Sequence, residues 1–549
     1  MKFDPILPQA RLDSEDAKKH WPDKLFCDYV DEAAAAMPDK TAWSNFNSMT
    51  GVQATLSFKE FQTLSDRIAL GLVAHGVEKD DVVSIQLPNW WEFAALYAAT
   101  SRIGAVINPL MPIFRQREIS YMTGFAESKV MVVPRNFRKF DYPEMMEELR
   151  SELPKLEHVI VIGGEGETSF ERALLDPALE EKFDKEALFK ERRPGPNDVS
   201  LLMYTSGTTG QPKGAMHTAN TLVAGVKTYA ELLELTEKDV VLMPSPFAHL
   251  TGFLYGLMLP VYLKATGVPQ DIWNAETYAQ LIEKEGATFS MGATPFLADF
   301  TNTAEVDKYD VSTFKQFICA GAPIPAVLVR DAKKKRNLRV ISAWGMTELG
   351  VATAVPPWAD VEKSATTDGL ALDGYEVKIV DAETGETAAP KQQGFLKARG
   401  VGAFVGYLKK PDKYGTDEEG WFDTGDIAYM DEEGYIRIAG RAKDIIIRGG
   451  ENIPVAEVEQ ALYRHPAIQE VAIVAMPDAR MGELGCAFAT LKEGTSLNFE
   501  EMVAFLEKQK MAKQYMPERL ELMDAMPHTP SGKIQKFKLR EIAQGLTKQ

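Results

Sequence analysis

Two stretches of the chain place apolar and polar segments in the same order. Residues 81–108 read as an apolar strand (DVVSIQL), a Pro-Asn turn, an apolar helix (WWEFAALYAATSRIG) and a second strand (AVIN). Residues 239–268 repeat this order with DVVLMP, PFAHLTGFLYGLMLPVYL and ATGV. The pattern predicts a βαβ unit in each stretch, and the repetition suggests two related sheet halves.

Four further apolar segments run directly into loops rich in Gly, Pro and Thr. They are SLLMY before TSGTTGQPKG, ATFSM before GATP, FKQFICA before GAPIP, and LRVISAW before GMTELG. Ligands of open α/β sheets bind beyond the carboxyl ends of the strands. We therefore expect these four loops to line one crevice.

The pattern changes twice toward the C-terminal end. Short strands separated by Gly turns predict a small β-rich subdomain over residues 374–440. From residue 443 the order helix, strand, strand, helix and basic tail predicts a separate α+β domain, and a length of 549 residues favours more than one domain. The predicted fold is α/β: a large N-terminal domain (1–442) of two βαβ-type sheets plus the β-rich subdomain, and a small mobile C-terminal domain (443–549).

Composition narrows the class of protein. Apolar residues make up 45% and charged residues 26% of the chain, which excludes disorder as its main state. The net charge of −18 and the lack of a long basic tract argue against a duplex nucleic-acid binder. The N-terminal sequence lacks the apolar core of a secretory signal, and no apolar run approaches the length of about 18 residues that spans a membrane.

The cysteines point to a reducing compartment. Cys27, Cys319 and Cys486 are far apart and lack the spacing of a disulfide framework or a zinc site. We therefore expect the protein in the cytoplasm.

The string YTSGTTGQPKG, residues 204–214, is the strongest local signal for a ligand. Its glycines, hydroxyls and single lysine, Lys213, allow backbone N–H groups and side chains to surround phosphate oxygens. It is not a Walker A loop, because Lys213 follows a proline and precedes a glycine. The other residues predicted to hold phosphate are Thr205, Ser206, Gly207, Thr208, Thr209 and Gly210.

This string resembles the signature phosphate loop of the adenylate-forming superfamily of acyl-CoA synthetases, luciferases and peptide-synthetase adenylation domains. The resemblance continues in order through PFAHLTG, GAPIP, WGMTE, WFDTGD, GRAKDIIIRGGENI and PHTPSGKIQK. It implies an AMP-forming acid:CoA ligase, in which an acid reacts with ATP, pyrophosphate leaves, and CoA takes the acyl group as a thioester. The implied ligands are ATP, Mg²⁺, CoA and a small carboxylic acid.

The WGMTE string supplies several of the implied nucleotide contacts. Trp344 offers a flat face for adenine, Thr347 a hydroxyl for the α-phosphate, and Glu348 an oxygen ligand for Mg²⁺. The same resemblance implies that Gly345 and Met346 also contact the nucleotide. The family usually has Tyr where Trp344 stands, so we expect stacking to survive and any phenol hydrogen bond to be lost. In the alternative interpretation, Glu348 only caps a helix.

Two further strings resemble the base and ribose contacts of the family. Gly321, Ala322 and Pro323 resemble its adenine-cradling turn. Asp426 in WFDTGD resembles the carboxylate that accepts both ribose hydroxyls. Ile438 matches a nucleotide contact of the family, and Arg441 matches a contact to the ribose. Alternatively, DTGD is only an Asx-type turn between strands.

The remaining matches concern the acyl group and the C-terminal domain. His249 in PFAHLTG matches a position that gates the acyl pocket, although a lone His beside apolar residues is more often part of a core. Lys533 matches the lysine that bridges the substrate carboxylate and the α-phosphate. The resemblance makes Lys443 a hinge, about which rotation replaces Lys533 by a loop whose Gly449 and Gly450 let pantetheine pass.

The expected acyl group is apolar. The candidate pocket segments 247–255, 292–296 and 344–351 contain no Lys or Arg, which disfavours a second carboxylate on the substrate. The strings GATPF, TTDGLALDGYEVKIVD and RGGENI resemble a branch that acts on short-to-medium fatty acids and on cyclohexanecarboxylate.

Three alternatives share part of this pattern: an enzyme that loads a carrier protein, a luciferase-like oxidase, and a nucleotide-binding regulator without catalysis. No carrier domain follows in the sequence, and a regulator would be expected to lack Lys533 or Glu348, which are both present.

The resemblance makes Lys533 essential to one half-reaction and places it in a loop. We therefore expect a lysine acetyltransferase as a partner, since acylation of Lys533 would remove its charge.

Overall fold

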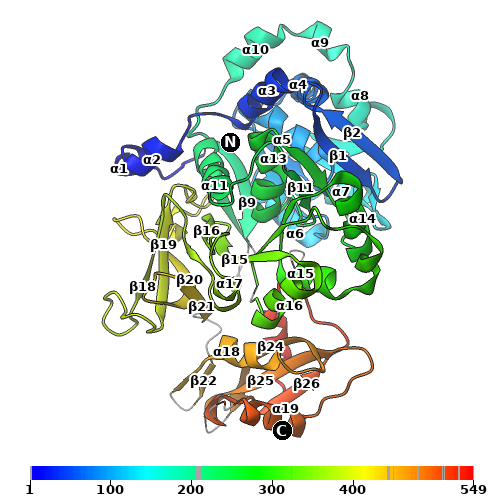
Figure 1. Ribbon diagram of the computed structural model, residues 1–549. Coiled ribbons are helices and arrows are strands. Elements are labelled where there is room, and N and C mark those ends of the chain that lie inside the picture. The colour runs from blue at the N-terminus through cyan, green and yellow to red at the C-terminus, as the bar shows by residue number, and fades with distance from the viewer. Residues whose placement is uncertain are drawn as a thin grey trace.

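The computed structural model describes residues 3–547 except 206–211, 323, 442–445, 449–450, 479–480, 510, 512 and 530–531, and only the backbone of 447, 451, 452 and 514. A large part containing two mixed sheets lies above a smaller part that holds the C-terminus (Figure 1). A β-rich subdomain lies beside the large part. This arrangement confirms the predicted α/β fold class.

A six-stranded sheet holds the first predicted βαβ unit. Its order is β10-β9-β4-β3-β5-β8. β3 (Val82–Ile85) and β4 (Val106–Pro109) are parallel neighbours, and α5 (Trp91–Ile103) joins them, as predicted. The other strands are β5 (Val130–Pro134), β8 (His158–Ile162), β9 (Val199–Thr205) and β10 (Lys213–Thr218).

A nine-stranded sheet holds the second βαβ unit. β11 (Val240–Met243) and β12 (Thr266–Pro269) are parallel, and the chain between them forms α12 (Leu250–Gly252), the π-helical η3 (Phe253–Met258) and α13 (Leu259–Leu263). The sheet order is β17-β16-β15-β14-β13-β11-β12-β1-β2. Its other strands are β1 (Thr41–Asn47), β2 (Val52–Ser57), β13 (Phe289–Gly292), β14 (Gln316–Cys319), β15 (Arg339–Met346), β16 (Gly350–Ala354) and β17 (Leu370–Ala371).

Three of the four predicted strand-to-loop segments lie side by side. β13, β14 and β15 are adjacent and parallel, so their carboxyl ends meet at one edge of the nine-stranded sheet. The fourth strand, β9, belongs to the six-stranded sheet. Residues that follow β13 and β14, and the end of β15, line a cleft together with residues of the C-terminal part.

Asn89 ties the two large sheets together just beyond β3. Its buried side-chain amide donates to the carbonyls of Ser245 at 2.9 Å, Gln270 at 3.2 Å and Met243 at 3.4 Å, which lie at the ends of β11 and β12. Its carbonyl oxygen accepts from the backbone N–H of Phe247 at 2.7 Å. The Asn89 amide therefore fixes the backbone at Phe247, two residues before His249.

Helices surround both sheets. The strongly apolar α5 is buried from Phe93 to Ile103 except at Arg102, whose guanidinium is paired with Asp31 at 2.6 Å and Asp66 at 2.8 Å. None of the described helices is long and apolar enough to cross a membrane. The others of this part are α1 (Gln9–Leu12), α2 (Glu15–His20), α3 (Phe26–Ala36), α4 (Phe58–Ala74), α6 (Gln116–Phe125), α7 (Tyr142–Leu149), α8 (Phe170–Leu174), α9 (Leu179–Lys182), α10 (Lys185–Arg192), α11 (Ala219–Leu232), α14 (Ala275–Glu285), α15 (Thr294–Asn302), α16 (Ala326–Arg336) and α17 (Val361–Thr366).

The predicted β-rich subdomain is an antiparallel sheet of the order β18-β19-β20-β21. Its strands are β18 (Tyr375–Val380), β19 (Gly394–Gly400), β20 (Phe422–Met430) and β21 (Ile436–Arg441). The middle of β20 and the end of β21 line the cleft described below, and each strand carries one of the predicted ribose contacts.

The C-terminal part has its own sheet and core. The predicted helix, two strands and helix are α18 (Val455–Leu462), β24 (Ile468–Asp478), β25 (Gly482–Leu491) and α19 (Phe499–Lys508). The sequence pattern missed β26 (Arg519–Leu522), which pairs in parallel with β25, and α20 (Lys536–Ala543). β22 (Ile446–Arg448) and β23 (Glu451–Ile453) complete the sheet. The boundary at residue 443 and the mobility of this part stay predictions.

Glu92, in the first turn of α5, predicts a pH-dependent loss of stability. Burial raises the pKa of its carboxyl from 4.5 to about 7. The unfolded chain ionises near the lower value while the folded chain keeps the neutral acid, so the free energy of unfolding falls as pH rises between the two values. We predict that Glu92→Gln is about 1 to 3 kcal/mol more stable than the wild type at pH 8, an advantage that vanishes toward pH 4.5.

Urea unfolding at several pH values measures this difference. Glu60→Gln is a control for which we expect the opposite effect on stability. Glu60 lies in the first turn of α4, and hydrogen bonds from Ser57 lower the pKa of its carboxyl. Removing this carboxylate should therefore destabilise the protein at pH 8. Equal stability of the wild type and Glu92→Gln at pH 8 would contradict the burial argument.

Candidate active site

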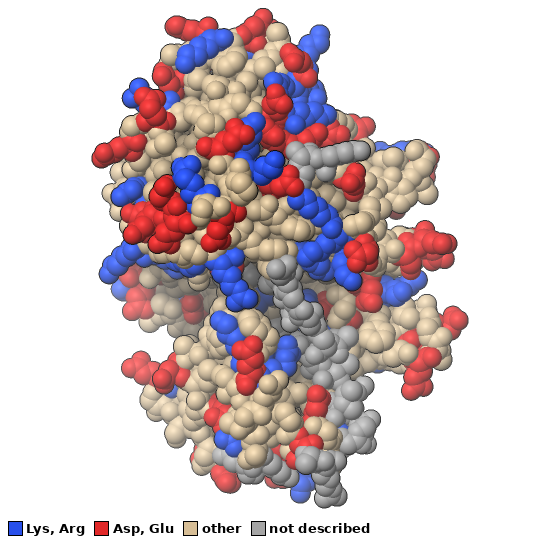
Figure 2. Space-filling model, turned by 180° about the vertical axis from the view of Figure 1, so that it is seen from behind, with Lys and Arg blue, Asp and Glu red and all other residues tan. Residues whose placement is uncertain are grey.

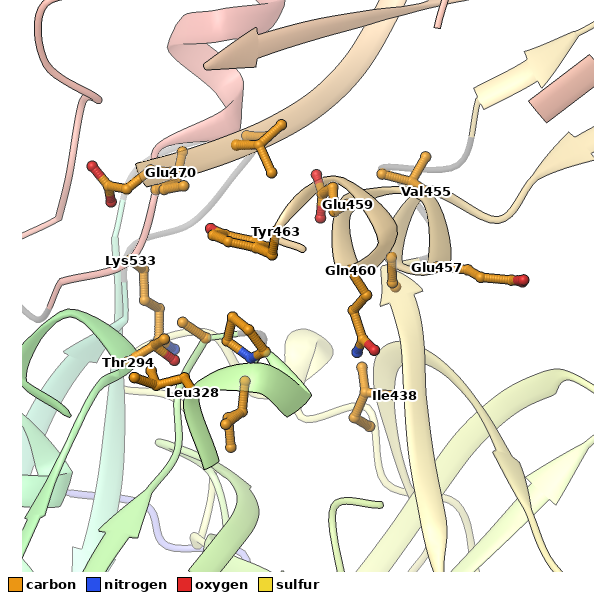
Figure 3. A pocket seen from close by; sticks show the side chains of 18 of the residues that line it. Thr294, Leu328, Ile438, Val455, Glu457, Glu459, Gln460, Tyr463, Glu470 and Lys533 are labelled. Carbon is orange, nitrogen blue, oxygen red and sulfur yellow. The ribbon is translucent and has the colours of Figure 1, made fainter. Parts of the chain in front are cut away.

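A cleft of about 1410 Å³ lies between the C-terminal part and the strand ends above it. Lys and Arg side chains gather along the hollow between the two parts (Figure 2). Gln460 of α18 and Tyr463, the residue just after this helix, point into the cleft, with Thr294, Leu328 and Ile438 on the opposite side (Figure 3). The predicted site residues that line it are Gly321, Ala322, Trp344, Gly345, Asp426, Ile438, Arg441 and Lys533.

Asp426 on β20 is a buried carboxylate of this cleft. Its Oδ1 is paired with Nε of Arg441 at 2.9 Å, and its Oδ2 accepts from the indole N–H of Trp344 at 2.9 Å. The Asx-type turn proposed as the alternative for DTGD also exists, but Asp423 makes it, by accepting from the N–H of Gly425 at 3.0 Å. The two aspartates of the string thus have separate roles.

Trp344 makes a hydrogen bond that the family pattern does not predict. The loss of a phenol hydrogen bond remains an expectation, while the indole N–H donates to Oδ2 of Asp426. Trp344 is 7% exposed, and it lines the cleft. A flat aromatic surface therefore lies directly beside the carboxylate that is predicted to bind ribose.

Glu348 lies in the tight turn between β15 and β16, so the alternative in which it caps a helix is wrong. The turn depends on Gly345, because a Cβ there would lie 2.2 Å from the carbonyl oxygen of Gly350. Inside the turn, the carbonyl of Thr347 contacts Nε2 of His217 at 2.8 Å. Burial lowers the pKa of His217 to about 4, and a carbonyl can only accept, so the neutral ring donates from Nε2.

Tyr407 holds the carboxylate of Glu348. Its hydroxyl donates to Oε1 of Glu348 at 2.5 Å, and both residues are buried. Nζ of Lys213, the first residue of β10, lies 4.0 Å from the centre of the Tyr407 ring, a cation–π contact. The pKa of Lys213 is lowered by burial, while the charge of Glu348 opposes that shift. Lys213, Tyr407 and Glu348 thus form one cluster.

Lys533 enters the cleft from the C-terminal part (Figure 3). A Cβ on Gly321 would lie 3.3 Å from Cε of Lys533, and Gly321 has a φ of +86°, so glycine suits this position on both counts. The backbone N–H of Lys533 donates to Oγ1 of Thr529 at 2.9 Å, which ties Lys533 to Thr529. Burial and the charge of Arg441 lower the pKa of Lys533, while two carboxylates, Asp426 and Glu348, oppose the shift.

His249 is the N-cap residue of α12. Its Nδ1 accepts from the N–H of Thr251 at 3.3 Å, which keeps the ring at the start of the helix. Burial, and then the charge of Lys533, lowers the pKa of His249 to about 3, so the ring is neutral. The charge of Lys533 therefore acts on His249, although the two residues are far apart in the sequence.

Two of the three candidate acyl segments, 247–255 and 344–351, contact each other. The backbone N–H of Val351 donates to the hydroxyl of Tyr255 at 3.0 Å, and the rings of Tyr255 and Tyr229 stack with their centres 4.0 Å apart. A Cβ on Gly350 would lie 3.3 Å from Leu254. The residues after His249 thus pack against the residues after Glu348, and both segments start at the predicted reacting centre.

Asp368 and Tyr407 are the site residues that the sequence patterns missed. Asp368 lines the cleft, accepts from the N–H of Ile438 at 2.8 Å and pairs with Arg437 at 3.3 Å, and burial raises its pKa. The only sequence signal for Asp368 was its place in the TTDG string, and Tyr407 had none.

Some predicted site residues do not line the cleft, and others lie outside the described residues. Thr205 ends β9 opposite Lys213, and Met346 ends β15 and packs partly against the core. The predicted residues outside the described ones are Ser206, Gly207, Thr208, Thr209, Gly210, Pro323, Lys443, Gly449 and Gly450.

The residues present fit a magnesium ion that is held mainly by ATP. Among the described residues, no cluster of three or more His, Cys, Asp or Glu side chains could hold a metal by itself. Mg²⁺ commonly binds one or two carboxylates together with substrate phosphates. Glu348 suits that role because Tyr407 occupies only one of its oxygens.

Comparison with known proteins gives a consistent result. Residues 30–408 match the family described as AMP-binding enzyme, and residues 457–533 match its C-terminal domain. The medium-chain fatty-acid–CoA ligase of Escherichia coli (strain K12) is 36% identical over 525 residues, covering 95% of this chain and 91% of the relative. A putative acyl-CoA synthetase, YngI of Bacillus subtilis (strain 168), is 33% identical over 93% of this chain and 94% of its own length.

A solved structure supports the same fold. ATP-bound MatB from Rhodopseudomonas palustris matches with a TM-score of 0.83 and 26% identity, covering 94% of this chain and 99% of that one.

The contact between Tyr407 and Glu348 generates a test. Tyr407→Phe keeps the ring under Lys213 but removes the donor to Glu348, so the carboxylate loses its fixed orientation. We predict that the Mg²⁺ concentration for half-maximal ATP–pyrophosphate exchange rises by about tenfold or more, since a hydrogen bond to a charged group contributes about 1.5 to 3 kcal/mol. Calorimetric titration of Mg²⁺ with ATP present should show the same shift.

Tyr414→Phe is the matched control, because Tyr414 lies in the same aromatic cluster and its hydroxyl contacts a backbone carbonyl. This variant should keep the Mg²⁺ dependence of the wild type. If Tyr407→Phe also keeps it, Tyr407 does not position Glu348 for the metal.

Proposed function

We propose, from the premise that this chain belongs to the family of AMP-binding enzymes, that its cleft joins an apolar carboxylic acid to AMP and then passes the acyl group to CoA. The chain is an AMP-forming acid:CoA ligase that uses ATP and CoA. The proposal concerns the acid and the residues that act. The observation that carries it is the position of Lys533, which belongs to the C-terminal part yet lies near Asp426, Glu348 and Gly321.

In the first half-reaction, a carboxylate oxygen of the acid bonds to the α-phosphorus of ATP, and the bond from that phosphorus to the oxygen of pyrophosphate breaks. The main barrier is charge, because an anion approaches a polyanion. Lys533 would contact the carboxylate and the α-phosphate, Thr347 the α-phosphate, and Lys213 the outer phosphates. Mg²⁺ on Glu348 would neutralise phosphate charge.

The surroundings of Lys533 suit a cation that works only when substrate is bound. Burial and Arg441 lower its pKa, which disfavours the charged form in the cleft without phosphate. The negative charge of bound ATP would raise that pKa again, as would the carboxylate of the acid. The ammonium would therefore be most stable where the two anions meet.

The second half-reaction needs a different arrangement. The thiolate of CoA attacks the acyl carbonyl, the bond to the AMP oxygen breaks, and AMP leaves with the electron pair. We propose that the C-terminal domain rotates about Lys443, which withdraws Lys533 and brings Gly449 and Gly450 beside the pantetheine arm. The position of Lys533 in the cleft supports assigning the present orientation to adenylate formation.

The proposed acid is apolar, of short or medium chain length or alicyclic, with cyclohexanecarboxylate among the candidates. Two observations support this choice: relatives are named medium-chain ligases, and the segments around His249 and Glu348 carry no Lys or Arg. His249 is held neutral at the start of α12, so it adds no cation for a second carboxylate.

The alternatives are less well supported. The named relatives transfer acyl groups to CoA, which does not favour carrier loading or a luciferase-like oxidase. A regulator without catalysis has no use for a lysine placed as Lys533 is.

Two further parts of the proposal concern the cell. The three cysteines are buried and free, which suits the reducing cytoplasm. Acylation of Lys533 by a lysine acetyltransferase would remove the charge needed for adenylation. Because Lys533 points into the cleft, such an enzyme would reach it only after the C-terminal domain has turned.

The lack of basic residues around the acyl group predicts strong discrimination against dicarboxylic acids. Burying a second carboxylate without a cation costs several kcal/mol, so kcat/KM for octanoate should exceed that for suberate by roughly a hundredfold or more. Thioesters formed from ATP, Mg²⁺, CoA and a panel of linear, alicyclic and dicarboxylic acids can be measured by mass spectrometry. Comparable turnover of octanoate and suberate would contradict the proposed acyl class.

The assignment of Lys533 is tested by separating the half-reactions. Lys533→Ala should abolish pyrophosphate exchange with acid and ATP, yet leave conversion of supplied acyl-adenylate to acyl-CoA largely intact. Gly450→Leu should do the reverse, because a branched side chain would fill the pantetheine passage and leave the phosphate site untouched. If each variant loses both steps while remaining folded, the two residues belong to one static site.

A further inference from the structure

Trp344 and Asp426 form a pair that links the predicted base-binding surface to the predicted ribose-binding carboxylate. The residues are 82 positions apart in the chain, and β15 and β20 bring them together. The donor is the indole N–H and the acceptor is Oδ2, at 2.9 Å. Trp344 is 7% and Asp426 4% exposed, so water competes little for this bond.

The carboxylate of Asp426 needs such a donor. A second buried carboxylate, Asp368, lies close enough that the charge of Asp426 helps to raise its pKa. The Arg441 side chain, which pairs with Oδ1, is 41% exposed and ends β21, two residues before the predicted hinge. Trp344 is therefore the buried donor to Asp426 from the large part, independent of the segment expected to move.

The hydrogen bond leaves room for the ribose. Each carboxylate oxygen has two lone pairs, and the structure uses one on Oδ1 for Arg441 and one on Oδ2 for Trp344. The remaining lone pairs can accept from two hydroxyls. Fixing both oxygens sets the plane of the carboxylate, and with it the direction of those lone pairs.

The same bond also orients the aromatic ring. An indole N–H lies in the plane of its ring, so a ring whose N–H is fixed on Asp426 presents its face in one direction. A phenylalanine would keep a flat face but no donor. The indole N–H thus fixes the ring of Trp344, which is predicted to stack on adenine, relative to Asp426, which is predicted to bind the ribose.

We propose that Trp344 is a positioning residue for Asp426, through which it sets the recognition of the ribose hydroxyls of ATP. The proposal rests on the proposed function, because it takes Asp426 as the acceptor of those hydroxyls. It adds that this acceptor binds the hydroxyls at full strength only when the indole N–H orients it. The Trp found where the family usually has Tyr is thereby part of ribose recognition as well as of the base surface.

Equilibrium binding of ATP and 2′-deoxy-ATP to the full chain tests the proposal. Trp344→Phe should weaken ATP binding about tenfold, as expected for loss of a hydrogen bond to a charged group. It should weaken 2′-deoxy-ATP less, so the preference for ATP over 2′-deoxy-ATP should fall about threefold or more. In a background of Asp426→Ala, adding Trp344→Phe should change that preference no further, which is the signature of a coupled pair.

Two controls separate positioning from packing. Trp21→Phe also removes a buried indole hydrogen bond, to the carbonyl of Val401 at 3.0 Å, but outside the cleft, and it should leave the preference unchanged. If Trp344→Phe fails to fold, β-(3-benzothienyl)alanine at position 344 replaces the N–H by sulfur with nearly the same shape. This residue should lower the preference in the same way.

The outcomes are distinct. If Trp344→Phe weakens ATP and 2′-deoxy-ATP by the same factor while Asp426→Ala loses the preference, Trp344 only stacks on the base, and the proposal is wrong. If wild type and Asp426→Ala show the same preference, Asp426 does not bind the ribose. That result would overturn the ribose assignment in the proposed function together with this inference.

Discussion

Charge repulsion between a carboxylate and a triphosphate is the constraint around which this site is arranged. The cations that can offset it come from different parts of the chain: Lys213 from β10 and Lys533 from the C-terminal part. Each is partly removed from water, and burial lowers the pKa of both. Two carboxylates of the site, Glu348 and Asp426, oppose that shift for Lys533. The cations and anions of the cleft therefore stabilise one another before any substrate binds.

The two carboxylates are held in the same manner. Tyr407 donates a hydroxyl to Glu348, and Trp344 donates an indole N–H to Asp426. A neutral aromatic donor fixes a carboxylate oxygen without cancelling its charge, so the anion keeps its capacity to bind a metal or hydroxyls. Both donors are buried, which makes each bond stronger than it would be in water. Preorganised polar groups of this kind need little rearrangement when charge develops in a reaction.

Local patterns predicted the elements, while contacts between distant residues escaped them. Strand and helix periodicity placed both βαβ units, the four-stranded subdomain and the helix-strand-strand-helix order of the C-terminal part. The same patterns could not show that Tyr407 reaches Glu348, 59 residues away, or that Trp344 reaches Asp426. Such bonds depend on how distant segments of the chain come together in the fold, which local sequence patterns do not encode. The helix-cap reading of Glu348 failed for the same reason, because the turn depends on the close approach that Gly345 permits.

The central claim is that Lys533 serves one half-reaction and leaves the cleft for the other, and chemical acetylation measures this directly. Lys533 and the exposed Lys391 can be acetylated briefly with an activated ester and their modification compared by peptide mass spectrometry. With ATP and a non-reactive acid analogue bound, Lys533 should be strongly protected relative to Lys391. With a stable acyl-adenylate analogue and CoA bound, it should become as reactive as an exposed lysine. Protection of Lys533 in both complexes would contradict the claim.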